Sequence, residues 1–368
     1  MNLAASTSIT VDFDAWPDFK QWDSMMTDSE QSNHIRGEIA KRVAVVGAGI
    51  SGLSCARILH EHGFNVTIFE KSRGSGGRTA TRRADPDLEF DHGAQYFTVT
   101  DPLFEPLVQS WIERGIAAEW HGRIVEIDGS IVKVKPPLPK RYVGVPGMTA
   151  MARQLAHDVP IQLQSRIVQV IRDDRIWRII DEGGRAYGPF DDLVVSLPST
   201  QAADLLGEHP LAMEIRAIPM NPCWAVMVAF ERPVNVNWDG AFVHQSPLAW
   251  VARNSSKPGR KPSPETWVLH ANPEWSVTHL KSHQEDAARL LLDEFVSLTM
   301  TASTPIHLEA HRWMFSSTPL SLDRLVLFDE NIGLVACGDW LAGGRVEGAF
   351  RSGNAAAARL LQHTATCH

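Results

Sequence analysis

Apolar residues near the start of the chain follow two different spacings, and the change between them marks successive elements. Residues 43–46 form an unbroken run of β-branched and small apolar side chains, which is typical of a buried parallel strand. Apolar positions then recur at helical spacing up to Gly63, which is placed to end a helix; they are Leu53, Ala56, Ile58 and Leu59. A second apolar run at 66–69 predicts another buried strand. This pattern predicts a strand–helix–strand unit of a parallel sheet.

The turn between this strand and this helix carries a glycine motif that is typical of dinucleotide binding. Gly47, Gly49 and Gly52 follow the G-x-G-x-x-G pattern, which suits a tight turn, close approach to a pyrophosphate and close packing of helix on strand. Ile50 begins the helix, whose free N–H groups and dipole favour phosphate. Glu70, at the tip of the second strand, is placed to accept hydrogen bonds from an adenosine ribose. The alternative is an ordinary turn followed by a surface glutamate.

A second glycine-rich loop, KSRGSGGR, comes directly after this acid. Its glycines let the backbone approach the other half of a pyrophosphate, and we expect Lys71, Gly77 and Arg78 to contact the cofactor, with Arg78 pairing with phosphate oxygens. A solvated basic turn is expected to hold the remaining cations, Arg73, Arg82 and Arg83. The loop resembles the FAD-binding signature of the flavin amine oxidase superfamily, so FAD is the expected dinucleotide.

A related signal, GLVACGDWLAGGRVEGAF, lies near the end of the chain. We expect a buried strand to end at Gly338 and a helix to start near Val346. An acid at a strand tip that faces a helix N-terminus suits FAD, with Asp339 accepting hydrogen bonds from the ribityl hydroxyls. Arg345 is predicted to face the substrate; the alternative is that it pairs with Glu347 or Asp339.

The patterns between these two signals predict two further groups of elements. After Asp101, a helical stripe of apolar residues is expected to pack in the core; it comprises Leu103, Phe104, Leu107, Val108, Trp111 and Ile112. Further along, the spacing predicts a hairpin at 124–134, a helix at 149–157, and a meander of strands at 161–170, 175–180 and 186–197 whose end rejoins the parallel sheet.

Alternating apolar and polar positions in the second half of the chain predict an antiparallel sheet. Its strands are expected at 224–230, 240–244, 248–252, 266–271 and 306–313, backed by an amphipathic helix at 282–300. The Pro-, Ser- and cation-rich stretch 253–264 is expected to be a solvated, mobile loop. The alternative is that Arg253 or Lys257 attracts a phosphate of the substrate.

Composition narrows the possible partners. With 44% hydrophobic and 21% charged residues and a net charge of −8, the chain is an ordinary globular protein, not expected to bind nucleic acid or an anionic membrane surface. No membrane span or secretory signal is expected. The four cysteines form no C-x-x-C pair, which favours a reducing, cytoplasmic location, and neither a metal site nor a serine nucleophile is predicted. Residues 1–38 are expected to be a flexible acidic tail, or alternatively to dock through Phe13, Trp16 and Phe19.

Three stretches together resemble one family, the renalases, and particularly their bacterial members. They are FDHGAQYFTV at 90–99, RYVGVPGM at 141–148 and WVARNSSKP at 250–258. The resemblance implies that the GAQYFT segment of the first stretch, residues 93–98, runs along the flavin ring, with contacts from Gln95, Tyr96, Phe97, Thr98 and Val99. It also implies that Ile167 lies against the adenine, for which the alternative is a sheet-core aliphatic. Cys223 stands where these relatives are expected to carry a small hydroxyl residue beside the flavin.

What the resemblance implies for activity is oxidation of the 1,2- and 1,6-dihydro isomers of NAD(P) to NAD(P)+. Hydride would pass to N5 of non-covalently bound FAD, and O2 would then be reduced to H2O2. Loss of hydride from a dihydropyridine leaves an aromatic cation, so no proton need be removed from the substrate. The substrate wall is expected to consist of Tyr142, Cys223, Trp224, His270 and Arg345. For each of these residues the alternative is packing in the core. A flavin-containing amine oxidase and a non-catalytic FAD-binding module remain alternatives.

The predicted fold is α/β, with a Rossmann-like FAD-binding domain built on a parallel sheet and a second lobe of antiparallel sheet and helices. This is the architecture of flavin amine oxidases and p-hydroxybenzoate hydroxylase. The FAD-binding domain is expected to comprise residues 39–100, 140–204 and 324–368, and the substrate domain residues 101–139 and 205–323.

Overall fold

The computed structural model of the protein describes residues 40–366 except 321 and 323. The acidic tail predicted for residues 1–38 lies outside the described residues. The described residues from Lys41 onward form one unit by their contacts, so the division into an FAD-binding domain and a substrate domain stays a prediction.

A six-stranded sheet is built around β1 (Arg42–Val46), which pairs in parallel with β2 (Asn65–Phe69) and β13 (Asp192–Val195). The strand order is β19-β20-β13-β1-β2-β9, and only β19 runs antiparallel to its neighbour. The remaining strands are β9 (Ile161–Gln162), β19 (Leu327–Asp329) and β20 (Leu334–Ala336). The parallel sheet of the predicted fold class is thereby confirmed.

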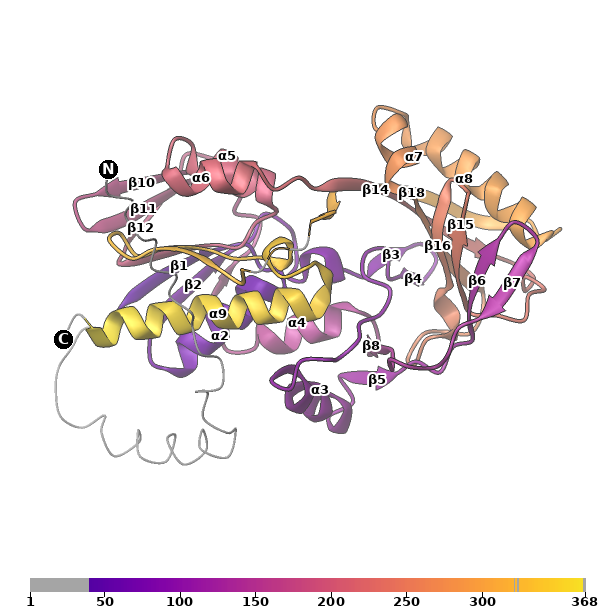
Figure 1. Ribbon diagram of the computed structural model, residues 1–368, viewed down its shortest axis with the longest axis horizontal. Coiled ribbons are helices and arrows are strands. Elements are labelled where there is room, and N and C mark those ends of the chain that lie inside the picture. Colours follow the sequence, from indigo (N-terminus) through magenta and orange to yellow (C-terminus); the bar gives the residue numbers. More distant parts are fainter. Residues whose placement is uncertain (1–39, 321, 323, 367–368) are drawn as a thin grey trace, which may run out of the picture. The chain divides into compact units, whose positions relative to one another are not determined.

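Both faces of this sheet are covered, which explains why β1 is apolar at successive positions. Val43 and Val45 pack in one core cluster, and Ala44 and Val46 pack in another. The first cluster is closed by α2 (Ile50–Glu61), α4 (Thr149–Leu155) and α9 (Arg345–Thr366) (Figure 1). The second is closed by β10 (Ile167–Asp173), β11 (Ile176–Asp181), β12 (Ala186–Phe190), α5 (Ser199–Leu206) and α6 (Pro210–Arg216).

The predicted second sheet has seven strands in the order β18-β14-β17-β16-β15-β6-β7. Its antiparallel part consists of β14 (Asn221–Phe230), β15 (Gly240–His244), β16 (Leu248–Arg253), β17 (Glu265–Ala271) and β18 (Pro305–Ser317). The predicted hairpin, β6 (Ile124–Asp128) and β7 (Ile131–Val134), extends this sheet because β6 pairs in parallel with β15. One face is covered by α7 (Pro273–Thr278) and α8 (Gln284–Thr299) (Figure 1).

Smaller elements join the two sheets. The apolar stripe predicted after Asp101 forms α3 (Phe104–Glu113), in which Phe104, Val108 and Trp111 are buried. Short strands that the apolar pattern did not predict are β3 (Arg82–Ala84), β4 (Leu88–Phe90), β5 (Ala117–Glu119) and β8 (Tyr142–Gly144). Single 3-10 turns occur at Gly77–Thr79, Asn254–Ser256 and Asp339–Leu341.

The register of β14 separates two residues that were both expected at the substrate wall. Successive side chains of a strand point to opposite faces. Trp224 points toward α7 and α8, where it is fully buried and its indole N–H donates to the carbonyl oxygen of His279. Cys223 points to the opposite face. The expectation that Trp224 lines the substrate wall is therefore wrong, because its indole belongs to the core.

We predict that Trp224→Ala lowers the free energy of unfolding by about 3–5 kcal/mol, because it leaves a large cavity in a close-packed cluster. Equilibrium urea unfolding, followed by circular dichroism, measures the change. Cys223→Ala, on the neighbouring residue that faces away from this cluster, serves as the control and should cost clearly less. Equal losses in the two variants would contradict the assigned register.

Candidate functional site

A cavity of about 1760 Å³ lies between the carboxyl ends of the parallel strands and the face of the seven-stranded sheet opposite α7 and α8. Its walls come from the turn after β1, the glycine-rich loop after β2, the segment from His92 to Tyr96, the tip of β20 and strands β14 to β18. Ligands of open α/β sheets bind at this edge, beyond the carboxyl ends of the strands.

The three glycines of the first turn have different reasons for lacking a side chain. A Cβ on Gly47 would lie 2.3 Å from the carbonyl oxygen of Ser196, and one on Gly52 would lie 2.1 Å from that of Gly47. Both glycines thus permit close backbone packing. A Cβ on Gly49 would meet no atom within 4 Å, although Gly49 lines the cavity and precedes α2. The fold itself therefore leaves room for a side chain at Gly49, beside the cavity.

Glu70 is buried at the tip of β2 and holds two backbone segments at the cavity. One carboxylate oxygen accepts from the N–H of Ala48 at 2.9 Å, and the other accepts from the N–H of Ser72 at 2.8 Å. A carboxylate has about four acceptor sites, so two such bonds leave capacity for further donors. The alternative of a surface glutamate is wrong, because Glu70 is buried and its carboxylate organises both phosphate-facing turns.

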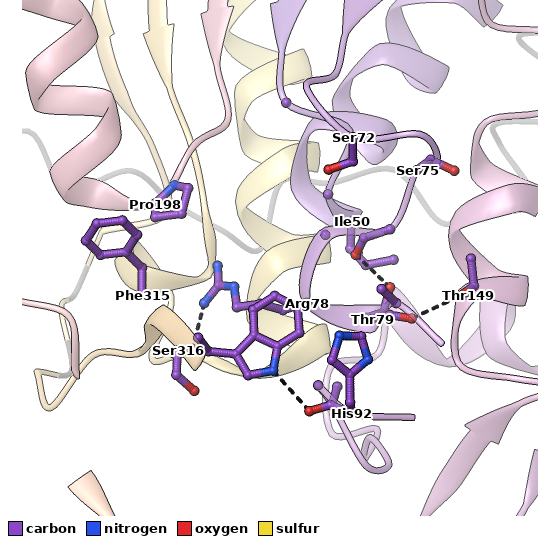
Figure 2. A pocket seen from close by; sticks show the side chains of 18 of the residues that line it. Ile50, Ser72, Ser75, Arg78, Thr79, His92, Thr149, Pro198, Phe315 and Ser316 are labelled. Carbon is purple, nitrogen blue, oxygen red and sulfur yellow. Dashed lines mark hydrogen bonds between the residues drawn. The ribbon is translucent and has the colours of Figure 1, made fainter. Parts of the chain in front are cut away.

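Arg78 connects the glycine-rich loop to two distant segments. Its guanidinium binds both carboxylate oxygens of Asp339, at 2.6 and 3.0 Å, and donates to the carbonyl oxygen of Ser316 at 2.9 Å (Figure 2). A bidentate arginine–carboxylate pair fixes direction as well as charge. The two residues predicted for the phosphates and the ribityl chain therefore lie in direct contact at the cavity wall.

The segment after β20 reaches α9 through consecutive residues with left-handed backbones. Gly343 and Gly344 have φ of 74°, and Arg345 follows with φ of 69°. This conformation is strained for arginine, and such strain is concentrated at functional sites. The alternative pairing of Arg345 is wrong: Asp339 pairs with Arg78, and Glu347 accepts from Thr100 and Asp101. Arg345 is exposed on the cavity wall.

A fully buried carboxylate, Asp91, precedes the segment that was expected to run along the flavin. It accepts from the ammonium of Lys257 at 3.3 Å and from the guanidinium of Arg260, and its other oxygen accepts from Thr81 and from the N–H of Met148. Burial alone would raise the pKa of Asp91, but the two cations lower it to about 2. Burial lowers the pKa of Lys257 to about 8.

This cluster corrects both interpretations of the 253–264 stretch. The stretch is not a solvated loop there, because the side chains of Lys257 and Arg260 are 0% and 3% exposed. Neither cation proposed for a phosphate lines the cavity: Lys257 binds Asp91 and the amide oxygen of Gln95, while Arg253 pairs with Asp239 and Glu265. The positive charges of Lys257 and Arg253 are therefore paired with carboxylates of the protein itself.

The cavity-facing side of the antiparallel sheet follows from its register. His270 lies opposite Trp250 on one side and Ala225 on the other, and Ala225 lies opposite His311. Residues that face one another across strands project to the same side of the sheet. Cys223 and Trp313 form the next cross-strand pair on that side. The resulting wall is aromatic and histidine-rich, with Phe242, Trp250, His270, His311, Trp313 and Cys223 all at the cavity.

His92 closes this wall from the opposite segment. Its carbonyl oxygen accepts from His270 Nε2 at 3.1 Å. It also accepts from the indole N–H of Trp313 at 3.0 Å, the bond drawn beside His92 in Figure 2. Its ring stacks on Trp313 with centroids 4.9 Å apart and meets His311 edge-on at 5.0 Å. Two donors on one carbonyl tie the segment from His92 to Tyr96 firmly to the sheet.

Burial keeps the titratable groups of this wall neutral. It lowers the pKa of His92 to about 3, with smaller contributions from His311 and Arg82, and lowers the pKa of His270 to about 4. Burial also raises the pKa of Cys223 to about 12. At neutral pH these three residues therefore carry no charge, and the imidazoles are weak bases.

Most of the residues predicted for the cofactor and substrate meet at this cavity. Those that line it are Gly47, Gly49, Ile50, Glu70, Lys71, Gly77, Arg78, Gln95, Tyr96, Ile167, Cys223, His270, Gly338, Asp339, Arg345 and Val346. Arg82 and Arg83, expected in a solvated turn, are largely exposed and also line it. His92, His311 and Trp313 belong to the site but were not predicted; alternation along β18 was the available signal for the last two.

Six predicted residues do not line this cavity: Gly52, Phe97, Thr98, Val99, Tyr142 and Trp224. Gly52 serves the close packing described above. Phe97 and Tyr142 exchange two backbone hydrogen bonds of 2.8 Å and are buried in the core around α2, so the predicted place of Tyr142 in the substrate wall is wrong. Val99 and Tyr142 line a separate pocket of about 260 Å³.

Comparisons with known proteins agree with this geometry. A profile described as NAD(P)-binding Rossmann-like domain matches residues 45–111, and one described as flavin containing amine oxidoreductase matches residues 129–361. The second match covers well over half of the chain. The chain belongs to the flavin-containing amine oxidoreductase family. It is thus a renalase-like member of the flavin amine oxidase superfamily and an FAD-dependent oxidoreductase.

Individual relatives in this family are distant. Mouse renalase is 22% identical over 300 residues, which cover 76% of this chain and 86% of the renalase. Cyclohexylamine oxidase from Brevibacterium oxydans superposes with a TM-score of 0.68 at 14% identity, over 89% of this chain and all of the oxidase. A protein from Exiguobacterium assigned as a protoporphyrinogen oxidase superposes with a TM-score of 0.71 at 12% identity, over 89% of this chain and all of that protein. At these identities the two structures establish the fold alone.

The residues at the cavity fit FAD, the cofactor of this family. The open side of Gly49 and the uncapped N-terminus of α2 would hold the pyrophosphate. Glu70 has acceptor capacity left for the adenosine ribose, and Asp339 lies at the tip of β20 for the ribityl hydroxyls. None of the helices in the described part of the chain is long and apolar enough to span a bilayer. Among the same residues, no group of three acidic, Cys or His side chains is arranged for a metal ion.

We predict that Gly49→Val folds but does not retain FAD, because its side chain projects into the space meant for the pyrophosphate. The ratio of flavin absorbance to protein absorbance should fall at least tenfold, while the far-ultraviolet circular dichroism of the apoprotein stays unchanged. Gly52→Ala provides the contrast, since its Cβ overlaps backbone and should destabilise the fold itself. Normal flavin content in Gly49→Val would contradict the assigned cradle.

A second prediction concerns the buried carboxylate. Asp91→Asn should lower the free energy of unfolding by about 3–5 kcal/mol, because it leaves two buried cations without their counter-charge. The matched control is Asp87→Asn, which removes an exposed carboxylate paired with Lys261 and should change stability little. Chemical denaturation of both variants at pH 7 makes the comparison. Similar small losses would mean that the Asp91 cluster does not hold the fold together.

Proposed function

We propose that this protein oxidises the 1,2- and 1,6-dihydro isomers of NAD(P) to NAD(P)+, with O2 as the final electron acceptor. The observation that carries the proposal is the neutral, aromatic character of the wall formed by Trp250, His270, His311, Trp313 and Cys223. The distant similarity to renalase supports the same activity. When bound, FAD would supply the redox chemistry: a hydride acceptor at N5 and transfer of two electrons to O2, which with a proton from the hydride and one from solvent would give H2O2.

The wall suits a substrate that needs orientation and not deprotonation. A dihydropyridine that loses hydride becomes an aromatic cation without losing a proton, so a strong base is not required. His92 and His270, with pKa values of about 3 and 4, are weak bases. The indoles of Trp313 and Trp250 at the cavity support the proposal, because aromatic faces stack on planar rings and stabilise positive charge.

The remaining residues would hold the rest of the dinucleotide and keep the wall rigid. Arg345 is exposed at the cavity and has a strained backbone, which favours a role in binding the polar part of the substrate. The hydrogen bonds from His270 and Trp313 to the His92 carbonyl fix both sides of the wall before substrate arrives. Preorganisation of this kind is how positioning lowers a reaction barrier.

Amine oxidation is the second candidate. It is favoured by the family assignment and by the fold shared with cyclohexylamine oxidase. The aromatic residues Tyr96, Trp250 and Trp313 at the cavity could equally flank a neutral amine. The two candidates differ in what the substrate must present to the wall, a planar dihydropyridine or an aliphatic C–N bond, so the choice is open to direct measurement.

We predict that, in anaerobic stopped-flow mixing, the 1,2- or 1,6-dihydro isomer bleaches the flavin at least a hundredfold faster than the 1,4 isomer or simple amines. Re-exposure to O2 should then restore the yellow form and release one H2O2 for each NAD(P)+ formed. The proposal is that a ring held on this wall brings C2 or C6, next to the ring nitrogen, to flavin N5, whereas the 1,4 isomer carries its hydride on C4.

The other outcomes are equally informative. Bleaching by amines alone would replace the proposal with amine oxidation. A flavin that no dihydropyridine and no amine bleaches would indicate an FAD-binding module that does not turn over.

A further inference from the structure

We propose that His270 is a specificity residue, whose unprotonated Nδ1 accepts a hydrogen bond from the N–H of a carboxamide on the substrate ring. The inference rests on the proposed function, because it names the chemical group by which a dihydropyridine would be recognised. It goes further in assigning one acceptor atom and in predicting which ring substituents are rejected.

The tautomer of His270 follows from its contact with His92. The acceptor at 3.1 Å from His270 Nε2 is a backbone carbonyl oxygen, which offers only lone pairs. Nε2 must therefore carry the proton. In a neutral imidazole the other nitrogen is then an acceptor, so the bond to His92 places a lone pair on Nδ1.

The surroundings of His270 keep the ring neutral. Burial lowers its pKa to about 4, the His92 carbonyl opposes this shift, and the positive charge of Lys257 adds to it. Other titratable groups also line the cavity. They are His92 and His311, whose pKa values are also lowered, Cys223, whose pKa is raised, and the ion pair of Arg82 with Glu309. Above about pH 5 the lone pair on Nδ1 is therefore available.

Nδ1 is free for a ligand. Among the hydrogen bonds of the described residues, His270 uses only Nε2. The side chain is partly exposed and lines the cavity, and Nδ1 is not among its fully buried atoms that lack a partner. A polar atom in an aromatic wall that is neither paired nor fully buried is placed to meet a ligand atom. A ring seated on this wall would cover Nδ1, and an uncompensated acceptor there is costly.

A lone pair selects for a donor. The primary amide of a nicotinamide ring has an N–H to give, whereas the methyl ketone of a 3-acetylpyridine ring has none. A carboxylate would bring acceptors and negative charge against Nδ1. His270 should therefore distinguish the amide from groups of similar size through hydrogen bonding, which discriminates more sharply than shape.

The test crosses His270→Phe with two substrates: the 1,2- or 1,6-dihydro isomer of the nicotinamide dinucleotide, and that of the 3-acetylpyridine dinucleotide. Phenylalanine preserves ring shape and removes Nδ1. We expect kcat/KM for the amide to fall about ten- to a hundredfold and kcat/KM for the ketone to change less than threefold. Equal losses for both substrates would overturn the inference and leave His270 a shape-filling residue.

His270→Gln is the second variant, since its amide oxygen restores an acceptor. It should recover part of the preference for the amide. In the wild type, kcat/KM for the amide should fall as pH drops toward 4, where protonation turns Nδ1 into a donor, and this acid limb should be missing in His270→Phe. An acid limb that persists unchanged in His270→Phe would count against the assignment.

Binding separates this inference from the proposed function. Dissociation constants of NAD+ and 3-acetylpyridine adenine dinucleotide are read from perturbation of the flavin absorbance, without turnover. If neither dihydropyridine bleaches wild-type flavin, the proposed function fails. A preference for the amide in binding that His270→Phe abolishes would still support the acceptor role. The absence of such a preference would overturn it.

Discussion

The ion cluster around Asp91 is the constraint on which both halves of the cavity depend. One buried carboxylate is shared by two cations, a hydroxyl and a backbone N–H that come from segments before β3, before α4 and after β16. The free-energy cost of burying three charges is offset only when every hydrogen-bond and ion-pair partner is in place. The two sheets therefore cannot move apart at this point without exposing an unpaired charge to an apolar interior, and the cavity between them has a defined width.

Rigidity at Asp91 is passed directly to the wall that meets the ligand. The next residue, His92, offers its carbonyl to His270 and Trp313, and Gln95 accepts from Lys257. The backbone carbonyl of His92 and the amide oxygen of Gln95 are thus held by protein partners. The same hydrogen bonds that hold the chain in place also set the tautomer of His270, so stability and recognition arise from one network.

Sequence patterns predicted the sheets, the main helices and the cofactor, because these follow from local periodicity and from glycines at defined spacing. These patterns failed for residues whose environment is set by partners far away in the sequence. Lys257 looks solvated in its own neighbourhood, since its partner Asp91 is 166 residues away. Trp224 and Cys223 could not be assigned to faces, because both sides of β14 are covered and apolar alternation is lost. The short helices α5 and α6 and strands β3 and β4 have too few residues for a periodic signal.

Fold alone does not distinguish the chemistries found in this family, since the same cofactor cradle accompanies different oxidations. The sheet face opposite the cradle carries none of the glycine motifs and is free to differ between members. In this chain that face combines aromatic rings with imidazoles that burial keeps neutral. A wall of protonated imidazoles would oppose a product that is itself a cation. Neutrality at this wall is therefore a functional property, produced by the packing that buries the histidines.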